Sequence, residues 1–154
     1  MADREREDLV VDASVATKWH LQDEEHVAPS LALLTRFAAG ELELWAPEYI
    51  RYEVPSAITV ATRGRAPRLT AELGQRAIEQ FLALGIRTRD SSELILSASP
   101  LAHRYGCALY DALYLALAQQ LGLPFVTADA KLYRLIRALP EVVWIGDYPP
   151  AHPT

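Results

Sequence analysis

The sequence predicts an α/β fold, a single domain with a central parallel β-sheet of about five strands flanked by helices on both sides. Short apolar segments alternate with helical segments along the chain, which is typical of parallel strands joined by crossover helices. The apolar segments show no polar alternation, so each strand should be buried on both faces. With 154 residues, 51% of them hydrophobic, the chain is long enough to form one domain with its own core.

The first half of the chain is expected to hold two strands and two helices. Residues 9–12 (LVVD) are an apolar run too short for a helix, and residues 42–46 follow the same pattern. Residues 24–39 place apolar side chains on one helical face. Pro47 should open the next helix, which runs to about residue 62, because the first helical turn tolerates proline. Pro55 lies inside that helix and should kink it.

The second half is expected to hold three strands and four helices. Thr70 should cap a helix over 71–84, and either Ser91 or Ser92 should cap one that runs to Tyr105. Residues 109–121 are apolar nearly all round, which predicts a central buried helix. The remaining predicted elements are strands at 86–89, 124–127 and 142–145 and a helix at 130–138. The domain is expected to span residues 1–154, with flexible ends at 1–8 and 148–154.

Four acidic residues occur where such a sheet places its working edge. Asp12 and Asp129 follow buried strands, so both should lie beyond the carboxyl ends of the strands. Glu53 lies near the start of the helix after the second strand, and Asp111 in the first turn of the apolar helix. A like-charge pair at about 4 Å costs about 4 kcal/mol at an effective dielectric near 20. Raised carboxyl pKa values or a bound divalent cation should therefore neutralise them.

The residue types near these acids favour a hard metal ion. No histidine or cysteine accompanies them, which weakens the case for zinc. All-oxygen ligation favours Mg²⁺ or Mn²⁺, with phosphate as the commonest substrate group, and this predicts metal-assisted hydrolysis of a phosphodiester. Each acid also has an ordinary structural interpretation. Asp12 and Asp129 would be helix caps, Asp111 a helix-dipole acid, and Glu53 a solvated residue near Arg51.

Four motifs resemble a PIN domain of the VapC toxin type. They are VVDAS at 10–14, RYEV at 51–54, LYDALYLALAQQLG at 109–122 and FVTADAKL at 125–132. The resemblance implies a PIN-like domain acting as a Mg²⁺-dependent RNA endonuclease, with Mn²⁺ as a possible substitute. It also implies a homodimer and a cognate antitoxin that masks the site. The family's metal-binding acids would fall on Asp12, Glu53, Asp111 and Asp129, and Ser14 and Thr127 would bond a carboxylate or a water on the metal.

Charge and cysteine content narrow the partners and the compartment. The net charge of −5 argues against a protein that coats nucleic acid without specificity. The segment 51–76 is nevertheless locally positive, and the expected RNA-phosphate contacts are Arg51, Arg63, Arg65 and Arg68; the alternative is a solvated helix face. Lys18 follows Asp12 closely enough to approach a substrate phosphate, but a side chain that faces solvent is the favoured interpretation. A lone Cys107 and a charged amino terminus predict a cytoplasmic protein without a membrane span.

Two alternatives to a nuclease remain open on the sequence. The first is a catalytically silent PIN-like module that binds protein or RNA and whose acids are structural. The second is a receiver-like phosphoacceptor domain, which also has a parallel sheet and acids at its edge. That class requires an acid pair after the first strand, whereas Asp12 is followed by Ala13 and Ser14.

Overall fold

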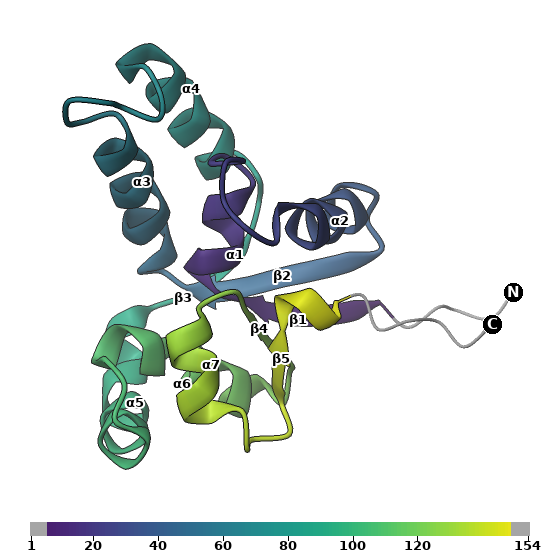
Figure 1. Ribbon diagram of the computed structural model, residues 1–154. Helices are drawn as coiled ribbons and strands as arrows, with labels where there is room; N and C mark the ends of the chain where they lie inside the picture. Colours follow the sequence, from purple (N-terminus) through teal and green to yellow (C-terminus); the bar gives the residue numbers. More distant parts are fainter. Residues whose placement is uncertain (1–5, 149–154) are drawn as a thin grey trace, which may run out of the picture.

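The computed structural model describes residues 6–148, and it forms a five-stranded parallel sheet in the order β3-β2-β1-β4-β5 (Figure 1). The strands are β1 (Glu7–Val11), β2 (Leu42–Pro47), β3 (Arg87–Arg89), β4 (Phe125–Thr127) and β5 (Val142–Trp144). Every neighbouring pair is parallel. The predicted fold class is therefore confirmed.

Seven α-helices connect and cover the strands within the described residues. They are α1 (Ala13–Lys18), α2 (Val27–Ala38), α3 (Ile50–Ala61), α4 (Ala71–Leu82), α5 (Ser91–Tyr105), α6 (Leu109–Leu121) and α7 (Ala130–Ile136), followed by the 3₁₀ turn η1 (Ile145–Asp147). Figure 1 shows α1 and α2 on one side of the sheet and α5 and α6 on the other, while α3 and α4 project from it as a helical hairpin.

The sheet register places the ends of β1 and β4 side by side. Val10 of β1 pairs with Trp45 on one side and with Phe125 on the other. The backbone N–H of Asp12 continues this ladder by donating to the carbonyl of Val126 at 3.0 Å. Residues that follow β1 therefore meet those that follow β4.

Helix α6 is the central helix of the core, as its sequence predicts. All residues from Ala112 to Ala118 are buried, and the helix packs on α5, β1 and β2. Gly122 ends it in the left-handed conformation, where a glycine carries no Cβ penalty. Because α6 is fixed along its length, the side chains of its first turn are held at a defined place beside the sheet.

Several predicted boundaries are wrong. Pro47 does not open a helix, because it is the last residue of β2 and pairs with Arg89 of β3. The pairing of β2 with β1 ends at Trp45, so the missing N–H of Pro47 costs no bond to β1. Helix α3 starts only at Ile50 and runs unbroken through Pro55.

Caps and chain ends show both agreement and differences. Thr70 caps α4 as predicted, accepting from the backbone N–H of Leu73. Asp90, and neither of the two serines after it, caps α5 by accepting from the N–H of Ser92. Glu7 and Asp8, expected in a flexible end, are the first residues of β1, and Tyr148 is buried. Arg6 is exposed and precedes β1, and residues 1–5 and 149–154 of the expected flexible ends lie outside the described residues.

The sequence predicts no membrane-spanning segment, and the helices of the described part of the chain bear on this prediction. Between residues 6 and 148, none of them combines the length and apolar character that crossing a bilayer requires.

Candidate active site

A pocket of about 320 Å³ lies at the carboxyl ends of the strands, and all four predicted acids line it. They come from the residue after β1 (Asp12), the first turn of α3 (Glu53), the first turn of α6 (Asp111) and the connection after β4 (Asp129). Ser14, Lys18 and Glu24 also line it. The topology thus brings four separated acidic segments to one concave site.

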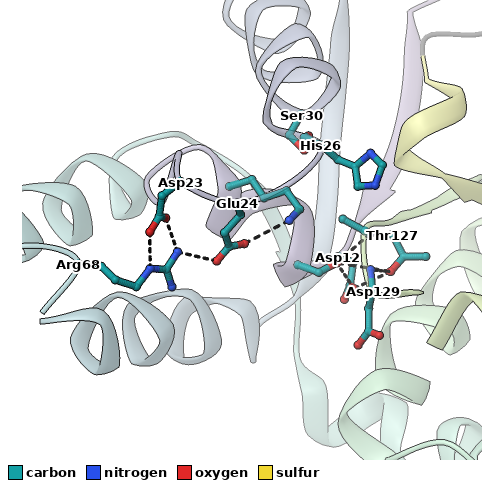
Figure 2. A network of polar contacts seen from close by, with 11 residues as sticks. Asp12, Asp23, Glu24, His26, Ser30, Arg68, Thr127 and Asp129 are labelled. Atoms are coloured by element: carbon teal, nitrogen blue, oxygen red, sulfur yellow. Dashed lines mark hydrogen bonds and ion pairs between the residues drawn. The ribbon is translucent and has the colours of Figure 1, made fainter. Parts of the chain in front are cut away.

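Asp12 is the most deeply placed acid of the pocket, with only 3% of its surface exposed. Its Oδ2 accepts a hydrogen bond from the hydroxyl of Ser14 at 2.6 Å. It also accepts one from the hydroxyl of Thr127 at 2.9 Å (Figure 2). Burial raises the pKa of Asp12 to about 6; the two hydroxyl donors oppose this rise, and the nearby charges of Asp111 and Asp129 add to it. Its side chain makes no capping bond to α1, so the interpretation of Asp12 as a helix cap is wrong.

The hydroxyls of Ser14 and Thr127 also fix the connection after β4. The Ser14 Oγ accepts from the N–H of Ala128 at 2.9 Å, and the Thr127 Oγ1 accepts from the N–H of Asp129 at 3.1 Å. Since each hydroxyl accepts from a backbone N–H, its own proton is free to point to Asp12. Two short polar side chains therefore join the ends of β1 and β4 and aim two donors at one carboxylate.

Asp129 has a structural role in addition to its place in the pocket. Its Oδ1 accepts from the N–H of Leu132 at 3.0 Å and caps α7. The interpretation of Asp129 as a helix cap is therefore right. The cap uses one carboxylate oxygen and fixes the orientation of the other.

Glu53 is partly buried and close enough to the other acids to feel their charge. Burial raises the pKa of Glu53 to about 8, with further increases from the charges of Asp12 and Asp111. The hydroxyl of the buried Tyr114, on α6, donates to Glu53 Oε1 at 3.3 Å. The interpretation of Glu53 as a solvated residue near Arg51 is wrong, because Glu53 is partly buried and Arg51 pairs with Glu48 at 3.5 Å.

Asp111 lies between two pockets. Burial first, and the charge of Asp129 second, raise the pKa of Asp111, while Lys131 acts in the opposite direction. Asp111 and Asp129 line both the first pocket and a second one of about 240 Å³. The second pocket is also lined by Cys107 and Lys131. These two acids thus form a wall shared by adjacent hollows.

The four acids do not form a ready-made metal cage. Within residues 6–148, no three His, Cys, Asp or Glu side chains are grouped so that they could hold a metal ion together. The four acids therefore line one pocket without three of them being close enough together to ligate one ion directly. The donor set still fits a hydrated Mg²⁺, since that ion keeps several waters and usually takes one or two carboxylates. No Lys or Arg of the described chain lies within 4.0 Å of any of the four carboxylates.

The four predicted arginines lie outside the acidic pocket. Arg51 pairs with Glu48, and Arg68 forms a two-nitrogen contact with Asp23 and a further bond to Glu24 at 2.9 Å (Figure 2). Arg63 and Arg65 are exposed, and between residues 6 and 148 neither has an ion-pair partner. Of the four predicted arginines, only Arg63 and Arg65 therefore have a guanidinium group that is not paired with an acid of the described residues.

Sequence reasoning missed Glu24 of the pocket and favoured the wrong environment for Lys18. Lys18 is buried, and its Nζ donates to Glu24 Oε1 at 3.2 Å; the expectation that it faces solvent is wrong. Had α1 been predicted, the four-residue spacing from Ser14 to Lys18 would have placed both on one helical face. Glu24 carries no such signal, because it lies in the connection between α1 and α2.

The fold and the site define an α/β protein with a carboxylate pocket at the carboxyl edge of a parallel sheet. The family model for the PIN domain matches residues 9–137, and the chain belongs to this family. PIN domains are generally nucleases and typically use divalent metals. The family match replaces the receiver-like alternative. No curated protein matches the chain.

Proposed function

We propose that this chain is a Mg²⁺-dependent RNA endonuclease and the toxin of a toxin–antitoxin pair of the VapC type. One observation carries the proposal. Four carboxylates from separated segments line one pocket, and none has a Lys or Arg of the described chain within 4.0 Å. Partly buried acids without a close counter-charge are relieved either by taking up protons or by a cation from outside the chain, and a hydrated Mg²⁺ in the pocket would supply that cation.

Asp12, Glu53, Asp111 and Asp129 would hold Mg²⁺, or Mn²⁺ in its place. When bound, the ion would activate a water for attack on the phosphodiester and stabilise the charge on the departing oxygen. Ser14 and Thr127 hold Asp12 by donating to its Oδ2. Tyr114 holds Glu53 by donating to its Oε1.

The proposed substrate is RNA, and the proposed protein partners are a second copy of the chain and an antitoxin. Arg63 and Arg65 supply exposed guanidinium groups for RNA phosphates. Large apolar side chains exposed on α3 and α5, namely Tyr52, Val60 and Leu96, supply surface for protein contacts. An antitoxin would neutralise the acidic pocket by inserting a cationic side chain.

The test is cleavage of a labelled RNA in Mg²⁺ by the purified protein and by Asp12→Asn. The variant should lose more than about 100-fold in activity, because even residues that only support metal ligands cost 10–100-fold. Glu43→Gln is the matched control, since Glu43 is a buried carboxylate on the adjacent strand and pairs with arginines. It should cleave like the wild type. Full cleavage by a folded Asp12→Asn would contradict the proposal.

A second candidate function is a silent PIN-like module that binds RNA or protein. It is favoured by the absence, within residues 6–148, of a three-acid arrangement for direct metal ligation. A silent module should show no saturable stabilisation by Mg²⁺ or Mn²⁺, whereas a nuclease site should.

A further inference from the structure

The only two lysines of the 154-residue chain, Lys18 and Lys131, line the two pockets that share acidic walls. Lys18 lines the 320 Å³ pocket with Asp12 and Glu53, and Lys131 lines the 240 Å³ pocket. Asp111 and Asp129 belong to both. Asp111 and Asp129 therefore separate two pockets, each of which contains one lysine.

Lys18 is held in place by a chain of charged contacts. Its Nζ bonds to Glu24 Oε1, and the other carboxylate oxygen of Glu24 accepts from Arg68 at 2.9 Å. Arg68 also donates two hydrogen bonds to the carboxylate of Asp23, as the dashed lines in Figure 2 show. Glu24 thus has both oxygens occupied and cannot swing without breaking a contact.

The Lys18 ammonium has N–H donors that are not bonded to Glu24. An ammonium carries three N–H donors, and one bond, to Glu24, accounts for its partners within residues 6–148. Only 8% of Lys18 is exposed, so its remaining donors can reach only groups that enter the pocket, either water or an oxygen of a ligand. The pocket it lines is the opening available for such a group.

Lys131 is exposed, unlike Lys18, but its ammonium can also bind a phosphate. It lies in the first turn of α7, is exposed, and lines the second pocket. It makes no ion pair within 4.0 Å among the described residues, so its charge is available to a ligand. A strand of phosphates would be repelled by the acids and needs a cation before and after them.

We propose that the two pockets form one groove for single-stranded RNA, in which Lys18 and Lys131 bind phosphates on either side of the carboxylates. The proposal rests on the proposed function and adds the path of the substrate across the site. A flexible single strand can follow two adjacent hollows, and positively charged grooves are how proteins commonly track such a strand. Lysine suits the role, because its ammonium is a compact point charge with three donors.

The test is a salt titration of RNA binding in the Asp12→Asn background, which lacks one pocket charge and should not cleave. Fluorescence anisotropy of a labelled single-stranded RNA of about 12 nucleotides is measured in EDTA, between about 50 and 200 mM salt. Lys18→Gln and Lys131→Gln should each weaken binding about tenfold at the lowest salt. Each should also reduce the slope of log K against log salt by about 0.7, and the pair by about 1.4.

The matched control is Arg137→Gln, an exposed cation that follows α7 and lines neither pocket. It should leave the slope unchanged, and Lys18→Arg and Lys131→Arg should restore most of the affinity. An unchanged slope in both glutamine variants, or no RNA binding by the parent protein, overturns the groove. If Lys18→Gln does not melt cooperatively, exposed Lys131→Gln decides by itself. Mg²⁺-dependent cleavage by the wild type is measured separately, so the proposed function can survive the failure of the groove.

Discussion

The acids at the amino edge of the sheet and the four acids of the pocket at its carboxyl edge have different kinds of partner. At the amino edge, Glu43 is buried on β2 and pairs with Arg6 and with Arg87, the latter at 3.3 Å. Glu7 and Glu41 share Arg36, at 3.0 and 3.2 Å. At the carboxyl edge, Asp12 is buried more deeply than Glu43 and has hydroxyl partners in place of a guanidinium.

Arginines pair with the acids of the amino edge, and no arginine of residues 6–148 pairs with the four acids of the pocket. A buried carboxylate without a counter-charge destabilises the folded state, and the carboxyl edge gathers several of them. Sites that are kept at the expense of stability are typical of function. The comparison also gives experiments, because the two edges should respond to pH, metal and mutation with different signs.

The largest expected effect is on the pH dependence of stability without metal. The folded pKa values of Asp12 and Glu53, about 6 and about 8, lie above the ordinary values of 3.8 and 4.5 for these side chains. Between those limits the folded state holds protons that the unfolded state has released. Stability should therefore fall as pH rises from about 4 to about 8, by about 3 kcal/mol for Asp12 alone.

Urea unfolding in EDTA at several pH values measures this fall. Asp12→Asn and Glu53→Gln should each make it shallower, whereas Glu43→Gln at the other edge should keep it. Stability that is flat or rising over this window in the wild type would show that the acids are not strained.

Metal addition should give the next largest effect. A ligand that binds only the folded state at 100 times its Kd stabilises it by about 2.7 kcal/mol. Mg²⁺ at saturating concentration should raise the melting temperature of the wild type and of Glu43→Gln alike. Asp12→Asn should show a smaller gain, and an equal gain in all three proteins would place the ion elsewhere.

Removing one hydroxyl donor should have an intermediate effect. Thr127→Val deletes the buried bond to Asp12 Oδ2 and the acceptor for Asp129 N–H, which should cost about 1–2 kcal/mol. The cost should shrink when Asp12→Asn is also present, because the bond to a charged acceptor is then absent. Thr127→Ser keeps the hydroxyl and serves as the control; a loss as large as that of valine would assign the effect to packing.

The smallest effect is expected at the amino edge. Glu43→Gln should destabilise by about 1 kcal/mol, since its arginine partners are half exposed and regain water. Asp12→Asn in the absence of metal should be neutral or stabilising. Thermal melting of the two variants side by side tests this reversal of sign, and a loss in both would remove the contrast between the edges.

The sequence was sufficient for the sheet, for six of the seven described helices and for the meeting of the four acids. Those predictions depend on periodicity and on the rule that parallel strands end at one edge, so they need no knowledge of contacts. Helix α1 was missed because ASVATK is six residues long and contains β-branched Val15 and Thr17, which lowers helix propensity.

The ion pairs could not be predicted from the sequence for a different reason. Arg68 and Asp23 are separated by 45 positions, and Lys18 depends on where the connection after α1 turns back. The cap of α5 illustrates the limit for neighbours, since Asp90 and the next two serines are all good capping residues. Propensity cannot choose among three candidates in a row, and the backbone conformation at Asp90 decides.

Arg68, in the connection between α3 and α4, links this helical hairpin to the pocket through Glu24 and Lys18. Its guanidinium is an exposed fork already shaped for a carboxylate. A protein that offers this fork an acidic side chain would compete with Glu24, loosen the grip on Lys18, and so alter the site without entering it.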